Sequence, residues 1–73
     1  MMKTVFTGRT VVEDGKGYVQ IENGELIEIN DSDLIEIFNG PELQKIKLQT
    51  LINTITKEGW PAFAGMDCFV TKI

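Results

Sequence analysis

The chain has 73 residues, a net charge of −4 from eleven acidic and seven basic side chains, one cysteine and no histidine. This length supports a single domain over residues 1–73 with a modest core, so we expect added stability from self-association as a homodimer. One cysteine excludes an internal disulfide, and the missing histidines remove the usual zinc ligands, so no metal or other cofactor is expected.

The first part of the sequence predicts a three-stranded antiparallel meander. β-branched and aromatic residues are concentrated in three segments, 4–12, 18–22 and 25–30. Asn23-Gly24 is the dipeptide that two-residue hairpins prefer, because both turn positions need a positive φ. A hairpin with this turn places Ile21 opposite Leu26, and apolar groups then occur on both faces of the meander.

Two interpretations are open for the segment that follows. Apolar residues at helical spacing and a capping residue at Asp31 or Ser32 favour a short helix over about 32–38. The alternative is a further strand, because residues 33–37 nearly repeat residues 25–29. We favour the short helix.

The longest predicted element is a helix over about 41–58. Apolar residues recur at i, i+3, i+4 and i+7, the spacing of one helical stripe: Leu48, Leu51, Ile52 and Ile55. Pro41 suits the first turn of a helix, and Gly59 suits the left-handed residue that ends one. We expect this helix to cover one face of the sheet.

The closing segment, residues 62–73, is apolar on both alternations, which is typical of a buried strand. We expect it to pair with the first strand. Together the elements predict an α+β fold, a small two-layer sandwich of a three-stranded meander, one main helix, a short helix and a C-terminal strand.

Residues 51–60, followed by a strand, resemble the ending of a group of small bacterial domains of unknown function. In those domains a Leu-rich helix runs into Glu-Gly-Trp and a closing strand. The likeness covers about a third of the chain, and Pro61 stands where the group has an acidic residue. The resemblance implies a fold and leaves the function open.

The distribution of charge gives the functional expectation. Residues 17–44 contain seven acidic side chains and no Lys or Arg, whereas the rest of the chain has four acids and seven bases. Such a block disfavours direct nucleic-acid binding, which depends on cations that neutralise phosphates, and favours a basic protein partner. We therefore expect a non-enzymatic interaction module with an acidic face. Its expected partner-binding residues are Glu28, Asp31, Asp33, Glu36 and Trp60.

The residues also carry alternative interpretations. Asp31, Asp33 and Glu36 fit helix capping and solvated charge better than a calcium loop, which needs a glycine at its sixth position. Trp60 either closes the edge of the core or anchors an interface. Cys68 has no histidine to activate it, so no catalytic residue is expected.

Two other functions remain open. The first alternative is an acidic inhibitor, encoded by a mobile element, that mimics nucleic acid. The second is a small-ligand-binding α+β domain with its pocket between helix and sheet. No apolar run is long enough for a signal peptide or a membrane span, which predicts a cytoplasmic protein without a membrane partner.

Overall fold

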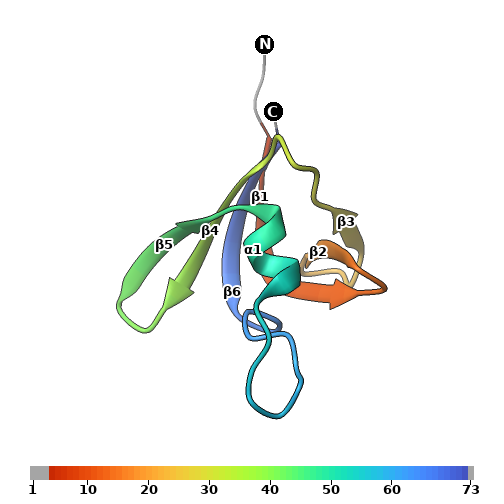
Figure 1. The fold of residues 1–73 in the computed structure, drawn as a ribbon. Coiled ribbons are helices and arrows are strands. Elements are labelled where there is room, and N and C mark those ends of the chain that lie inside the picture. The colour runs from red at the N-terminus through yellow and green to blue at the C-terminus, as the bar shows by residue number, and fades with distance from the viewer. Residues whose placement is uncertain (1–3, 73) are drawn as a thin grey trace.

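The computed structural model describes residues 4–72 and consists mainly of one antiparallel sheet. Within this range there are six strands and one six-residue helix: β1 (Thr4–Glu13), β2 (Lys16–Gln20), β3 (Leu26–Glu28), β4 (Leu34–Asn39), β5 (Glu42–Ile46), α1 (Leu48–Asn53) and β6 (Asp67–Lys72). The strand order is β3-β2-β1-β6-β4-β5 (Figure 1). The predicted α+β sandwich is therefore wrong, because the fold is mostly β.

The first three strands form the predicted meander, but with a different register in the second hairpin. Gln20, and not Ile21, lies opposite Leu26. The N–H of Ile21 donates to the carbonyl of Glu25 at 3.0 Å, and the side chain of Asn23 accepts the N–H of Glu25 at 2.9 Å. The asparagine therefore stabilises a longer loop through a local side-chain turn, where the sequence predicts a two-residue turn.

Residues 34–46 form a β-hairpin where the sequence predicts helices. β4 pairs with β5 from Ile35 opposite Ile46 to Asn39 opposite Glu42. Gly40, the first residue of the two-residue turn, has a φ of +64°, as a type II′ turn requires. The short helix predicted over 32–38 is wrong, and the chain adopts the strand alternative because alternate residues of β4 point into the core.

The predicted helix over 41–58 is also wrong in its extent, because only residues 48–53 are helical. Leu51 is fully buried, whereas Ile55 lies exposed in the following loop. α1 packs on β2 over Gly17, where an added Cβ would lie 2.8 Å from Leu48 Cδ1 and 2.9 Å from Leu51 Cδ2. Residues 42–46 are not part of the helix, because their backbone pairs with β4.

The core lies between α1 and the sheet face that it covers. Its fully buried apolar residues come from β2, the end of β3, β4, β6 and α1: Val19, Ile29, Ile35, Ile37, Leu51, Cys68 and Val70. Thr10 is buried beside them. Its hydroxyl donates to the carbonyl of Phe63 and accepts the N–H of Met66, the latter at 3.2 Å. These bonds attach the long loop after α1 to β1.

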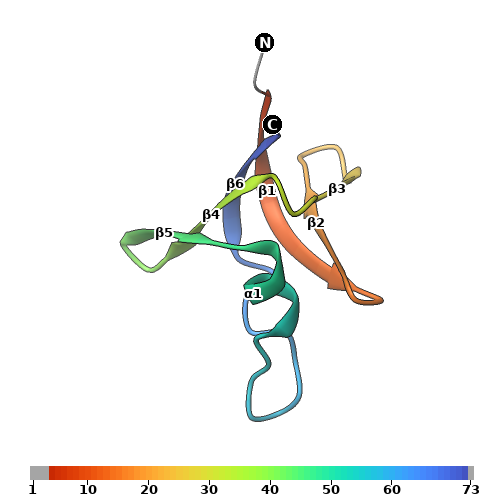
Figure 2. The same ribbon diagram turned by 45° about the horizontal axis from the view of Figure 1, so that its top comes forward.

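β6 comes last in the chain but lies inside the sheet, between β1 and β4 (Figure 2). It pairs with β1 from Arg9 opposite Asp67 to Thr4 opposite Lys72, which confirms the predicted pairing of the closing and first strands. The strand begins at Asp67, and not at residue 62, while Ile73 lies outside the described residues. β6 thus joins the β1–β2–β3 meander to the β4–β5 hairpin.

Candidate binding surfaces

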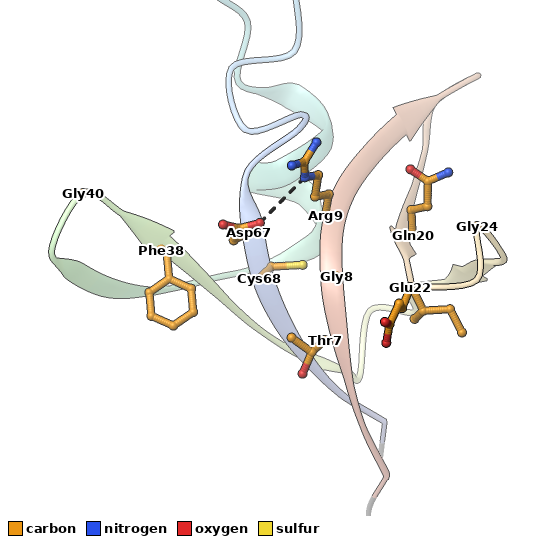
Figure 3. Close-up of a pocket in the computed structure, with 11 residues that line it drawn as sticks. Thr7, Gly8, Arg9, Gln20, Glu22, Gly24, Phe38, Gly40, Asp67 and Cys68 are labelled. Carbon is orange, nitrogen blue, oxygen red and sulfur yellow. Dashed lines mark ion pairs between the residues drawn. The ribbon is translucent and has the colours of Figure 1, made fainter.

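The sheet face turned away from α1, here called the outer face, carries a shallow groove. Because side chains alternate along a strand, burial of Thr10 and Cys68 on the α1 side turns Arg9 and Asp67 outward. The groove has a volume of about 990 Å³ and crosses β1 and β6, with Phe38 on one side and Gln20 on the other (Figure 3). It lies opposite the predicted ligand pocket between helix and sheet.

Arg9 and Asp67 supply opposite charges over the centre of this groove. Arg9 Nε lies 3.8 Å from an Asp67 carboxylate oxygen, and both side chains are about three-quarters exposed. Such an exposed pair contributes little to stability, because water screens it. The pair also neutralises itself, so the groove presents no strong net charge at its centre.

Cys68 contributes to the lining of the groove, but its side chain is buried in the core on the α1 side of the sheet. Burial, with a smaller contribution from the neighbouring Asp67, raises the pKa of Cys68 to about 11. At neutral pH the thiol therefore lacks the thiolate that nucleophilic attack requires. Among residues 4–72, no group of three or more His, Cys, Asp or Glu side chains is placed to hold a metal ion.

Exposed carboxylates gather around β3, one of the two open edges of the sheet. We call Glu22, Glu25, Glu28 and Asp31 the acidic edge; all four are exposed and lie on β3 or within four residues of it. The ion pairs found in the described part of the chain, Arg9 with Asp67 and Lys72 with Asp33, include none of them. Within residues 4–72, their negative charges are therefore not neutralised by an ion pair.

The fold places the acidic side chains of residues 17–44 in separate parts of the molecule. Glu28 and Asp31 belong to the acidic edge. Asp33 is buried, where its carboxylate forms an ion pair with Lys72 and accepts the N–H of Asn30 at 2.8 Å. Glu36 lies on β4, opposite Lys45 of β5, with β1 and β6 between it and the acidic edge. The expected partner-binding carboxylates therefore do not form one face.

Trp60 lies in the loop that follows α1 and is 69% exposed, so it does not close the edge of the core. Ile55 and Pro61 form an isolated β-bridge at the base of this loop. Above the bridge, the N–H of Thr56 donates to the carbonyl of Trp60 at 2.8 Å, and Thr56 Oγ1 accepts the N–H of Trp60 at 3.2 Å. Trp60 is therefore a surface side chain on this loop.

The sequence interpretation missed β5, the second open edge, because it placed these residues in a helix. All of β5 except the half-buried Ile46 is exposed. On the outer face Leu43, 45% exposed, lies opposite Phe38, 39% exposed. The Phe38 ring packs edge-to-face on Phe69 with centroids 5.1 Å apart. The signal that could have revealed this hairpin is Asn39-Gly40-Pro41, a turn sequence between two segments that contain apolar residues.

Among the described residues, no helix is long and apolar enough to cross a membrane. No family model matches the chain, and neither the curated proteins nor the solved structures include a significant match to it. The resemblance of residues 51–60 to small bacterial domains of unknown function therefore stays a prediction.

Proposed function

We propose that the protein is a small non-enzymatic interaction module that self-associates and binds a basic partner through its acidic edge. The observation that carries this proposal is the group of four exposed carboxylates around β3, none of which forms an ion pair within residues 4–72. Clustered charges of one sign attract and orient a partner of the opposite sign. The same charges repel nucleic-acid phosphates.

The chemistry of the groove supports a binding role over a catalytic one. Cys68 is held as a neutral thiol, and Arg9 and Asp67 pair with each other. A nucleic-acid mimic would need a continuous row of carboxylates, whereas Glu36 and Glu42 lie on the strands farthest from β3. We therefore favour the interaction module.

A lysine decapeptide tests the acidic edge. We expect the full chain to bind the peptide at low salt and to release it as salt is raised, because exposed charges are screened. The variant Glu22→Gln/Glu25→Gln/Glu28→Gln should bind about tenfold more weakly, since exposed ion pairs contribute roughly 0.2–1 kcal/mol each. Titration calorimetry measures both effects.

The matched control removes three exposed carboxylates elsewhere, as Glu13→Gln/Asp14→Asn/Glu58→Gln. Both variants change the net charge by the same amount. If the control weakens peptide binding as much as the acidic-edge variant does, net charge alone explains the binding and the proposed site is wrong.

A further inference from the structure

β5 has a neighbour on one side only. It pairs with β4 and ends the sheet, and the β4–β5 hairpin extends away from the other strands (Figure 1). Its five residues contain no proline and no bulge that would block a new neighbour. An edge of this kind offers its free N–H and C=O groups to another strand.

The hairpin turn determines which backbone groups of β5 are free. Asn39 and Glu42 flank the two-residue turn, and the hydrogen bond of such a turn joins these two residues. Hydrogen-bonded and non-hydrogen-bonded pairs alternate along an antiparallel ladder. The even-numbered residues of β5 therefore bond to β4, whereas Leu43 and Lys45 direct their N–H and C=O groups to the open side.

We propose that the open side of β5 binds β5 of a second copy of this chain, antiparallel, with Gln44 on the two-fold axis. Leu43 of each copy then lies opposite Lys45 of the other, and each such pair exchanges both of its backbone hydrogen bonds. The two sheets become one continuous sheet with a common outer face. This inference rests on the self-association in the proposed function and identifies the open edge of β5 as the dimer interface.

Charge complementarity favours a second copy as the occupant. The β5 segment has an acid at its start, Glu42, and bases at its end, Lys45 and Lys47. Antiparallel pairing brings the acidic start of one strand near the basic end of the other. Glu42 is on the α1 face and Lys45 on the outer face, so these charges offset each other without a direct ion pair. The β3 edge offers the opposite case, because it has three residues and its carboxylates would repel those of a second β3.

Apolar burial on the outer face adds to this pairing. Leu43 lies beside Phe38, which packs on Phe69, so a partly exposed apolar strip runs up to the open edge. In the proposed dimer the strip of one copy meets the strip of the other across the axis. The stem of Lys45 covers the partner copy's Leu43, as long charged side chains do on apolar surfaces.

A cysteine on the axis tests this register. In non-hydrogen-bonded pairs the Cα atoms lie about 4.5 Å apart, within the range of a disulfide. Under mild oxidation we expect Gln44→Cys to convert most of the chain from 8.2 kDa to a species of about 16 kDa on a non-reducing gel. Cys68 is buried and does not compete. The matched control, Glu28→Cys on the β3 edge, should stay at 8.2 kDa.

A second variant tests the backbone pairing. Lys45→Pro removes an N–H that faces the open side, and an edge strand tolerates proline at such a position. We expect sedimentation to show at least about tenfold weaker dimerisation with an unchanged circular dichroism spectrum, since paired backbone groups lose their partners. If Lys45→Pro does not fold, the Gln44→Cys result decides alone.

Several results would overturn the proposal. The first is a wild-type chain that is monomeric at high micromolar concentration. The second is a Gln44→Cys variant that stays reduced. The third is a disulfide that forms only between Gln44→Cys and Glu28→Cys chains in a mixture. The last result would indicate head-to-tail contact. A chain that binds the lysine peptide without crosslinking through residue 44 removes the β5 interface and leaves the acidic edge standing.

Discussion

Two glycines show how closely single positions control the packing of this sheet. A Cβ on Gly8 would lie 2.0 Å from the carbonyl oxygen of Gln20, a backbone atom of the neighbouring strand. A Cβ on Gly17 would instead meet the methyl ends of Leu48 and Leu51, at 2.8 and 2.9 Å. Side-chain ends move more easily than a paired backbone, so the two contacts differ in consequence.

We predict that Gly8→Ala destabilises the protein more than Gly17→Ala does. The leucines can change rotamer to admit a methyl group on residue 17, at a cost of roughly 1–3 kcal/mol. On residue 8 the methyl group forces β1 and the end of β2 apart, so the loss should exceed that range. Urea denaturation measures both, with Thr7→Ala, at an exposed neighbouring position, as control. A larger loss for Gly17→Ala would contradict this.

The sequence predicts an element well where local residues determine its structure. It predicts an element poorly where pairing with a distant strand determines the structure. Asn23-Gly24 located a turn, and Leu48 and Leu51 located the buried stripe of α1. Residues 42–46 consist mainly of good helix formers, yet they form β5, because β4 supplies a partner backbone. That partner is recruited by the burial of Ile35 and Ile37 against β6, which the local pattern does not contain.

The helical stripe supports a prediction at this scale. Leu51 is fully buried and is the only residue of α1 in that class, so Leu51→Ala should lower the free energy of unfolding by roughly 2–5 kcal/mol. Thr50→Ala, on the exposed side of the same helix, should change it little. Chemical denaturation of both variants gives the comparison. A negligible loss for Leu51→Ala would mean that α1 does not anchor the core.

For the whole molecule, the order of strands in the sheet decides where charge lies, and sequence order conceals it. The acidic block, residues 17–44, contributes β2 and β3 to one side of the sheet and β4 and β5 to the other. Of the expected site, Glu28 and Asp31 remain together. The sequence alone does not reveal that Asp33 is buried in an ion pair, because its partner Lys72 is 39 residues away along the chain.

The central place of β6 predicts that the fold is indivisible. β6 pairs with β1 on one side and with β4 on the other. A chain that ends at residue 65 should therefore lack a cooperative thermal transition, because the two halves of the sheet lose their common neighbour. Adding a peptide of residues 66–73 should restore the transition. A cooperative transition in the shortened chain alone would show that the halves fold independently.

The position of β6 also constrains how the protein folds during its synthesis. A ribosome releases the meander and the β4–β5 hairpin first, while the strand that must enter between them is still to be made. Until residues 67–72 emerge, the nascent chain holds two unfinished half-sheets whose facing strands, β1 and β4, each lack a neighbour. Translation order, more than the strength of any hairpin, thus sets the earliest moment at which the sheet can close.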